Sequence, residues 1–303
     1  MNRALMVPCD PAGALLDALR THGISPADPG EIVADGILHR FQIDGDKRGS
    51  RNGWAVLHRD HGAAGSWKSG VSCTWSAKST SRMTRQEKDA HFQMLRRAKA
   101  EAQRQREAEH EAAAARASAL WSKARPASPD HPYLRKKHIP PGNARQQGNL
   151  LVLRVEDADG NIRSLQYIAP NGVKKLLTGG AKRGHFIVVD GTLPAGLIVL
   201  AEGWATSMTV ATQFPGAAVL AAVDAGNLEP VALAIRAKYP DAQIVICADD
   251  DRLTPGNPGL TKARAAAAAV KGKLVRPIWP AGIPLEASDF NDLAVYLMEV
   301  AHV

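Results

Sequence analysis

The acidic run Asp249-Asp250-Asp251 directly follows the branched apolar stretch Gln243–Ala248, which is typical of a short buried strand. At an effective dielectric constant of ~20, two like charges ~4 Å apart repel by roughly 4 kcal/mol. A fold that crowds these carboxylates therefore favours a neutralising partner, and hard carboxylate oxygens suit Mg²⁺ or Mn²⁺. A solvated acidic turn is the alternative interpretation. Asp249 and Asp251 share one face of an extended backbone, whereas Asp250 is expected to face away.

A second apolar stretch, Leu197–Ala201, ends in Glu202-Gly203. The surrounding sequence alternates apolar runs with helical patterns, which predicts βαβ units and an α/β fold with a parallel sheet flanked by helices. The further expected elements are strands at 217–223 and 273–278 and helices at 228–239 and 260–270. Because parallel strands end at one edge, Glu202 should project there together with Asp249 and Asp251.

These two strand ends, LIVLAEG (197–203) and IVICADDD (244–251), resemble the signature of the Toprim domain found in primases and topoisomerases. The resemblance is closest to DNA primases carried by phages and conjugative plasmids. It extends to residues 150–186, to Asn257-Pro258-Gly259 and to SDFNDL (288–293), and it covers the last half to two thirds of the chain.

The resemblance implies an enzyme of the DNA-directed RNA polymerase (primase) type, a nucleotidyltransferase that makes short RNA primers by Mg-dependent phosphoryl transfer in phage or plasmid replication. Asp249 and Asp251 would coordinate the metal, and Glu202 would act as a further ligand or as a general base. The implied partners are single-stranded DNA and ribonucleoside triphosphates, with a replicative helicase as a further candidate. A Toprim nuclease and a non-catalytic Toprim module that binds single-stranded DNA are the alternatives.

Cations and glycines lie together between the predicted strands, at Lys174, Lys175, Lys182 and Arg183. Glycines let backbone N–H groups approach phosphate and the cations supply charge, so we expect these residues to contact nucleic acid or nucleotide. An ordinary basic hairpin loop is the alternative.

Three other polar positions follow the acidic run. Asn257 and Gly259 are expected to shape the loop after it, near phosphate at the start of the next helix. Asp289 is at least as well explained as the cap of the last helix as by metal binding.

Composition agrees with a nucleic-acid partner. The chain has 303 residues and a formal net charge of +8, which favours polyanions, although excess charge also aids solubility. Cys9, Cys73 and Cys247 are scattered, which argues against a disulfide framework or a zinc ribbon, so zinc is not expected. No apolar stretch is long enough to span a bilayer, and we expect a cytoplasmic protein with no membrane partner.

The chain divides on composition into four predicted parts. A small mixed α+β module without zinc ligands is expected to carry a helix at 11–23 and strands at 37–41 and 54–58. The next part lacks proline and glycine and predicts one long helix, a solvated spacer with little to bury. The parts are residues 1–83 (N-terminal module), 84–125 (helical linker), 126–190 (N-terminal half of the primase core, with strands at 150–155 and 162–168) and 191–303 (Toprim domain).

Overall fold

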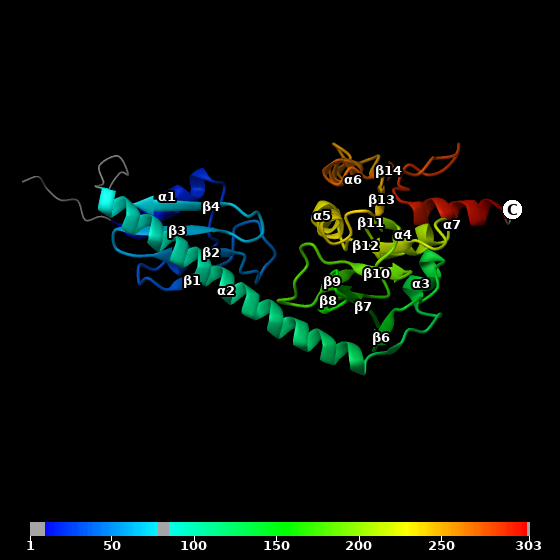
Figure 1. Cartoon of the computed structure of the whole chain (residues 1–303), viewed down its shortest axis with the longest axis horizontal. Helices are drawn as coiled ribbons and strands as arrows, with labels where there is room; N and C mark the ends of the chain where they lie inside the picture. Colours follow the sequence, from blue (N-terminus) through cyan, green and yellow to red (C-terminus); the bar gives the residue numbers. More distant parts are fainter. Residues whose placement is uncertain (1–9, 78–84, 302–303) are drawn as a thin grey trace, which may run out of the picture. The chain divides into compact units, whose positions relative to one another are not determined.

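The computed structural model of the chain describes residues 10–77 and 85–301 (Figure 1). Cys9 and the predicted boundary at residues 83 and 84 lie outside these ranges. The chain divides into two compact units, residues 1–107 and 108–303, which we describe separately. Within the described ranges, no helix is both long and apolar enough to cross a lipid bilayer.

The N-terminal unit is a four-stranded antiparallel sheet in the order β1-β2-β3-β4, and one helix packs on it. Leu15 and Leu19 of the helix are fully buried against Phe41 and Leu57 of the sheet. The predicted helix and the two predicted strands are confirmed, and two further strands complete the sheet. The elements are α1 (Pro11–Thr21), β1 (Leu38–Phe41), β2 (Gly53–Leu57), β3 (His61–Ser66) and β4 (Ser72–Ser76).

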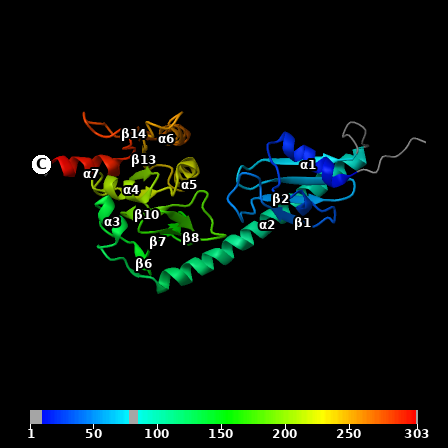
Figure 2. The same ribbon diagram turned by 180° about the vertical axis from the view of Figure 1, so that it is seen from behind.

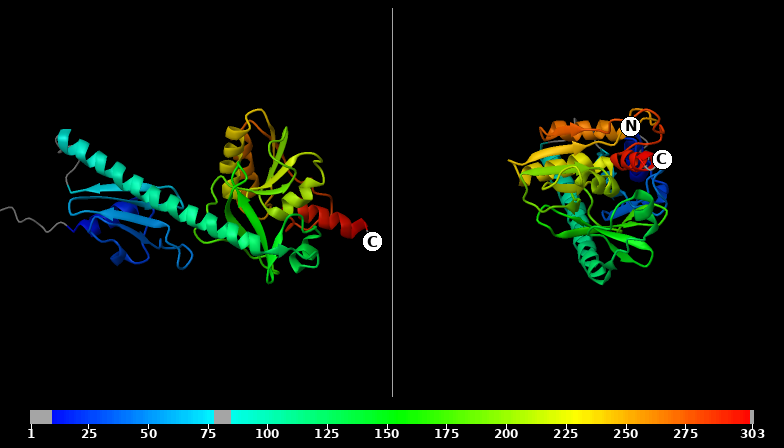
Figure 3. Two further views of the ribbon diagram at one scale, coloured as in Figure 1. Left: turned by 60° about the horizontal axis from the view of Figure 1, so that its bottom comes forward. Right: turned by 90° about the vertical axis from the view of Figure 1, so that its right-hand side faces the viewer.

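The long helix α2 (Arg85–Lys123) confirms the predicted helix, but its second half is not a solvated spacer. Ala113 and Ala117 are fully buried, and Ala117 packs against Val152 and Leu165 of the following sheet. Arg116 Nη2 donates a hydrogen bond to the Thr178 carbonyl (2.9 Å). The expectation that this helix has little to bury is therefore wrong for residues 108–123, because its small alanine side chains pack on the sheet. Figure 3 shows this end of α2 running beside the strands that follow it.

An antiparallel sheet follows in the order β5-β6-β7-β8-β9. The two predicted strands around the turn at Asp159 are its central pair, β7 and β8. The basic pair Lys174-Lys175 lies on the edge strand β9 and not in a loop. The elements are β5 (Arg125–Pro126), α3 (Pro132–Lys137), β6 (Arg145–Gln147), β7 (Leu150–Glu156), β8 (Ile162–Ile168) and β9 (Lys174–Leu176).

The last part forms a second five-stranded sheet in the order β10-β12-β11-β13-β14. Strands β12, β11, β13 and β14 run parallel, as predicted, and β10 pairs antiparallel with β12 at the edge. The elements are β10 (Ile187–Asp190), β11 (Leu197–Ala201), α4 (Trp204–Ala211), β12 (Ala218–Ala221), α5 (Leu228–Lys238), β13 (Gln243–Cys247), α6 (Pro258–Ala269), β14 (Lys273–Val275) and α7 (Phe290–Ala301).

Alternating residues of the parallel strands face two separate cores. Ile198 and Leu200 of β11 pack towards α5 and α6, whereas Val199 and Ala201 pack towards α4 and towards Leu151 and its neighbours on the antiparallel sheet. Figures 1 and 2 show α5 and α6 on one side of this sheet and α4 and α7 on the other. The shared core fixes the antiparallel sheet on the parallel one, so residues of both can reach the same edge.

Candidate active site

The register of the two central parallel strands sets the acidic residues at one edge. Ala201 of β11 lies opposite Cys247 of β13, so Glu202 leaves the sheet one residue beyond this pair and Asp249 two residues beyond it. The predicted common edge is therefore present. Electrostatics agrees, because the charge of Asp251 acts on Glu202, and the charges of Glu202 and Asp251 act on Asp249.

Asp249 is the most strongly perturbed of these acids. Burial, followed by the charges of Glu202, Asp289 and Asp251, raises the pKa of its carboxyl group to about 9. Its Oδ1 atom is buried and has no hydrogen-bond partner in the structure. A buried carboxylate oxygen without a partner is costly, so this position favours a bound cation or a retained proton.

Glu202 and Asp251 are each held by a backbone N–H group. Burial and then the Asp251 charge raise the pKa of Glu202, and a hydrogen bond from the backbone of Ala225 acts against this shift. Asp251 Oδ2 accepts a hydrogen bond from Gly259 N (2.8 Å). Across the described residues, no three acidic, histidine or cysteine side chains are already arranged to hold a metal ion.

Asp250 faces away from this group, as expected, and its side chain is only 4% exposed. Its oxygens accept hydrogen bonds from Asn257 Nδ2 (2.6 Å) and Trp279 Nε1 (2.8 Å), and Arg276 lies 3.5 Å away. Asp250 is therefore a structural anchor for the acidic loop.

Asn257 and Gly259 shape this loop from the start of α6. Asn257 adopts a left-handed conformation (φ 42°), which asparagine tolerates, and its Oδ1 accepts from Asp251 N (3.0 Å) and Leu260 N (3.3 Å). A Cβ on Gly259 would lie 2.8 Å from Asp251 Oδ2 and 3.0 Å from the Asp249 carbonyl oxygen. The Gly259 N–H, which we expected near phosphate, is instead bonded to Asp251.

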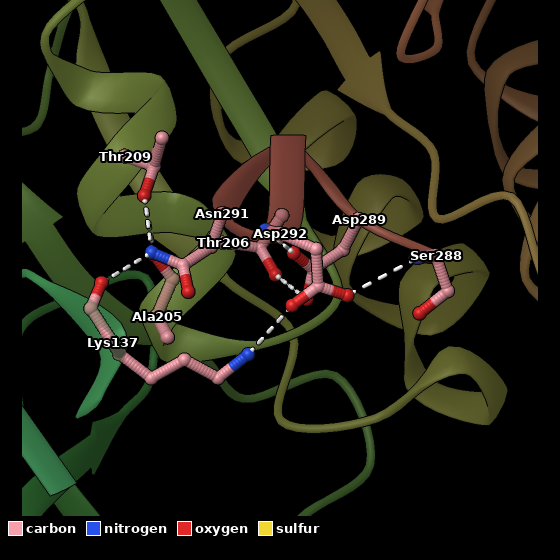
Figure 4. Close-up of polar contacts among 8 residues, drawn as sticks. All are labelled: Lys137, Ala205, Thr206, Thr209, Ser288, Asp289, Asn291 and Asp292. Atoms are coloured by element: carbon pink, nitrogen blue, oxygen red, sulfur yellow. Dashed lines mark hydrogen bonds and ion pairs between the residues drawn. The ribbon is translucent and has the colours of Figure 1, made fainter. Parts of the chain in front are cut away.

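Asp289 lies directly before α7, beside Thr206 of α4 (Figure 4), and its charge reaches Asp249. Its Oδ1 accepts from Asp292 N (2.8 Å), so it caps the helix as predicted, and its Oδ2 accepts from Thr206 Oγ1 (3.1 Å). Its charge also raises the pKa of Asp249. Asp292 lies with Asp289 in the acidic segment SDFNDL noted in the sequence, and the two have the spacing of a helix-capping pair, whereas nothing in the sequence indicates Thr206.

The four predicted basic residues come from two segments, and in each segment only the first residue reaches the acidic edge. Lys174 Nζ lies 3.5 Å from the point that a Cβ on Gly203 would occupy, and its charge lowers the pKa of Glu202 and Asp249. Lys175, its neighbour on β9, points to the other face of the strand. Lys182 forms an ion pair with Asp224 (2.6 Å), whose charge also acts on Glu202, while Arg183 is exposed. The structure therefore brings Lys174 and Lys182 to the acidic edge but does not place Lys175 and Arg183 there.

The loop that carries Lys182 and Arg183 is fixed by Asn227, which is 1% exposed. Asn227 Nδ2 lies within hydrogen-bonding distance of the carbonyls of Lys182, His185 and Ala222 (2.8–2.9 Å), and its Oδ1 accepts from Gly184 N (2.9 Å). The basic loop is thus attached to the same sheet edge as Glu202.

The donor chemistry of this edge fits a hard divalent cation. Glu202, Asp249 and Asp251 supply only carboxylate oxygens, which are the ligands of Mg²⁺ and Mn²⁺. The unpartnered Oδ1 of Asp249 is the observation that favours such an ion. The carboxylates are near enough for Asp251 to raise the pKa of Glu202 and for Glu202 and Asp251 to raise the pKa of Asp249, although Glu202 and Asp251 also bond backbone N–H groups.

Comparison with known proteins agrees with this geometry. Residues 197–296 match the family model described as a Toprim domain. The chain is 37% identical over 290 residues to a DNA primase TraC of Escherichia coli, covering 90% of this chain and 27% of that protein. A second DNA primase TraC of Escherichia coli is 34% identical over 285 residues, covering 89% and 20%. The resemblance to Toprim primases inferred from the two strand ends is therefore confirmed.

A solved structure is also similar. It is the primase fragment of the bacteriophage T7 primase-helicase protein. The match covers 56% of this chain and 72% of the fragment, with 18% identity and a TM-score of 0.41. The chain spans 27% and 20% of the length of the two curated relatives.

Proposed function

Because residues 197–296 of this chain form a Toprim domain, we propose that the chain is a DNA primase that synthesises short RNA primers on single-stranded DNA in plasmid or phage replication. The observation that carries the proposal is the convergence of Glu202, Asp249 and Asp251 at the end of two parallel strands, in a chain similar to DNA primase TraC over 90% of its length. The template and the ribonucleoside triphosphates are its proposed partners in the cytoplasm. A replicative helicase stays a predicted partner.

Asp249 and Asp251 are the proposed ligands of Mg²⁺ or Mn²⁺, with Glu202 beside them as a further ligand or a general base. Bound metal supplies activation of the primer hydroxyl and neutralisation of the pyrophosphate leaving group. The protein residues orient the reacting groups. Asn257 and Gly259 hold the acidic loop, and Lys174 offers a positive charge to phosphate oxygens at the same edge.

Removal of the divalent metal is expected to abolish ribonucleotide incorporation on a single-stranded DNA template. The purified chain is incubated with template and labelled ribonucleoside triphosphates in Mg²⁺, and in excess chelator. The carboxylate-only site predicts incorporation in Mg²⁺ and none in chelator, with recovery when Mn²⁺ is added.

Two outcomes of the same assay would contradict the proposal. Cleavage of the template without incorporation would indicate a Toprim nuclease. Binding of single-stranded DNA that is insensitive to Mg²⁺ and gives no product would indicate a non-catalytic Toprim module. As a control for nuclease activity, the wild-type chain is incubated with supercoiled DNA and cleavage of that DNA is measured.

Lys174 and Lys175 provide a matched pair of substitutions on one strand. Lys174→Met is expected to reduce primer synthesis by about tenfold, because its charge reaches Glu202 and Asp249, whereas Lys175→Met should have less than a threefold effect, because it points to the other face. Initial rates at varied ribonucleotide concentration test this. Equal effects of the two substitutions would indicate a general loss of positive charge rather than a specific contact.

A further inference from the structure

Helix α3 provides a rigid base on the antiparallel half of the catalytic unit. It begins at Pro132, and its cap residue His131 uses Nδ1 to accept from Tyr133 N (3.2 Å) while Nε2 lies 3.0 Å from the Asn149 carbonyl. Tyr133 and Leu134 are buried in the shared core. Lys137, the last residue of this short helix, is therefore attached to a fixed element.

Two contacts connect α3 to the first turn of α7 (Figure 4). Lys137 Nζ lies 3.0 Å from Asp292 Oδ1, in an ion pair whose side chains are 24% and 31% exposed. Asn291, which is 1% exposed, donates from Nδ2 to the Lys137 carbonyl (2.8 Å) and to Thr209 Oγ1 of α4 (2.9 Å). The start of α7 is thus bonded to both α3 and α4.

Hydrogen bonds continue from this turn into the acidic loop. Asp292 Oδ2 accepts from Ser288 N (3.1 Å), and the Ser288 carbonyl accepts from Asp250 N (2.6 Å). Asp250 lies between Asp249 and Asp251, so Ser288 fixes the backbone that carries both acids. Through its N–H, Asp292 also bonds Asp289 Oδ1 (2.8 Å). The Asp292 carboxylate therefore contacts both Lys137 and Ser288, and its backbone N–H bonds the cap residue Asp289.

The negative charges around Asp292 explain why its ion pair with Lys137 is needed to hold this carboxylate in place. Asp289 caps the helical turn that contains Asp292, and after burial the charges of both raise the pKa of Tyr133, so these charges lie close to one region of α3. Lys137 is the cation that bonds one of them directly. Without it, the Asp292 carboxylate is repelled by the neighbouring acids and can turn towards water, which would release Ser288.

We infer that Lys137 is a positioning residue for the acidic site: its ion pair with Asp292 fixes the first turn of α7 and, through Ser288, the backbone between Asp249 and Asp251. The inference rests on the proposed function in taking these acids as the divalent-metal ligands. Outer-shell partners of this kind typically change metal affinity by about 10- to 100-fold when removed.

The test measures Mn²⁺ binding by calorimetry, which does not depend on catalysis. Lys137→Met keeps the aliphatic stem and removes the charge, and it is expected to raise the Kd for Mn²⁺ about tenfold. Lys137→Arg should bind within threefold of wild type, because the guanidinium can pair with the same carboxylate. Lys136→Met is the matched control, because Lys136 is exposed on the same helix, and its Kd should be unchanged.

Asp292→Asn tests the same pair from the other side, in case Lys137→Met folds poorly. If the two residues act together, the double variant binds Mn²⁺ no more weakly than the weaker single variant. Wild-type Mn²⁺ affinity in both Lys137→Met and Asp292→Asn would overturn the inference. Failure of primer synthesis in the wild-type chain, with Mn²⁺ binding intact and reduced by Lys137→Met, would refute the primase proposal but leave this one standing.

Discussion

Replacing Asp249 by asparagine is expected to abolish metal-dependent primer synthesis and, in chelator, to raise the melting temperature of the chain. The loss of activity follows because asparagine cannot supply the anionic oxygen of the proposed metal site. The gain in stability follows from burial and from the neighbouring acids Glu202, Asp289 and Asp251, which oppose ionisation of Asp249 in the folded protein. The asparagine side chain is uncharged in both the folded and the unfolded chain, so it does not carry this cost.

The pH dependence gives this prediction a definite sign. The pKa of Asp249 is 3.8 without the protein environment and about 9 in the fold, so between these values the unfolded chain is ionised while the folded chain keeps the proton. The free energy of unfolding therefore falls as pH rises through this window. At pH 8 in chelator, Asp249→Asn should melt about 4–8 °C higher than wild type, equivalent to ~2 kcal/mol, with little difference at pH 4.

Thermal unfolding at both pH values, with and without Mg²⁺, measures the effect. Asp241→Asn is the matched control, because Asp241 is exposed just before the same strand, and it should change neither stability nor synthesis. Primer synthesis within about tenfold of wild type in Asp249→Asn would show that this acid is not a metal ligand.

Replacing Gly259 by alanine is expected to reduce primer synthesis by about 100-fold while the chain still folds. The added methyl group would lie 2.8 Å from Asp251 Oδ2 and 3.1 Å from Asp249 Cβ, so both acids must move. A displacement near 1 Å at reacting groups typically costs about 100-fold in rate. The same crowding should lower the free energy of unfolding by about 1–3 kcal/mol.

Gly196→Ala is the control for this substitution. A Cβ there meets open space, and Gly196 precedes β11 in the same sheet, so synthesis and stability should be nearly unchanged. Urea unfolding and primer synthesis are measured on both variants. Wild-type activity in Gly259→Ala would mean that the acidic loop tolerates rearrangement and that its present geometry does not limit catalysis.

The central part of the fold could be predicted from sequence because its strands are buried on both faces. Runs such as Leu197–Ala201 and Gln243–Cys247 are dominated by branched apolar residues and are soon followed by acids, so the sequence predicts both the strands and the acidic site at their ends. Most of the strands that the sequence does not predict are short or lie at sheet edges, whereas β3 is interior but consists largely of glycine and alanine. Lys174–Leu176 is exposed and basic, and only its pairing with β8 makes it a strand.

The supporting residues of the site could not be found in this way, because the contacts are tertiary. Lys137 and Asp292 are separated by 155 positions, and nothing local in Pro132–Lys137 indicates which carboxylate it will meet. Asn227 likewise resembles an ordinary loop residue, although it organises the basic loop through its amide. The packing of the second half of α2 is not evident from the sequence, because alanine has a weak hydrophobic signature even where it is fully buried.

The packing of the second half of α2 on the antiparallel sheet determines where the chain can be cut to give a fragment that folds by itself. Trp121 lies beneath the guanidinium groups of Arg145 and Arg154, and its carbonyl accepts from Arg145 Nη1 (2.7 Å). A truncation at the proline-rich segment after Lys123 would remove this tryptophan and uncover Val152 and Leu165. An independently folding fragment should therefore start upstream of Ala108, because residues 108–123 of the helix belong to the packed core of this unit and not to a linker.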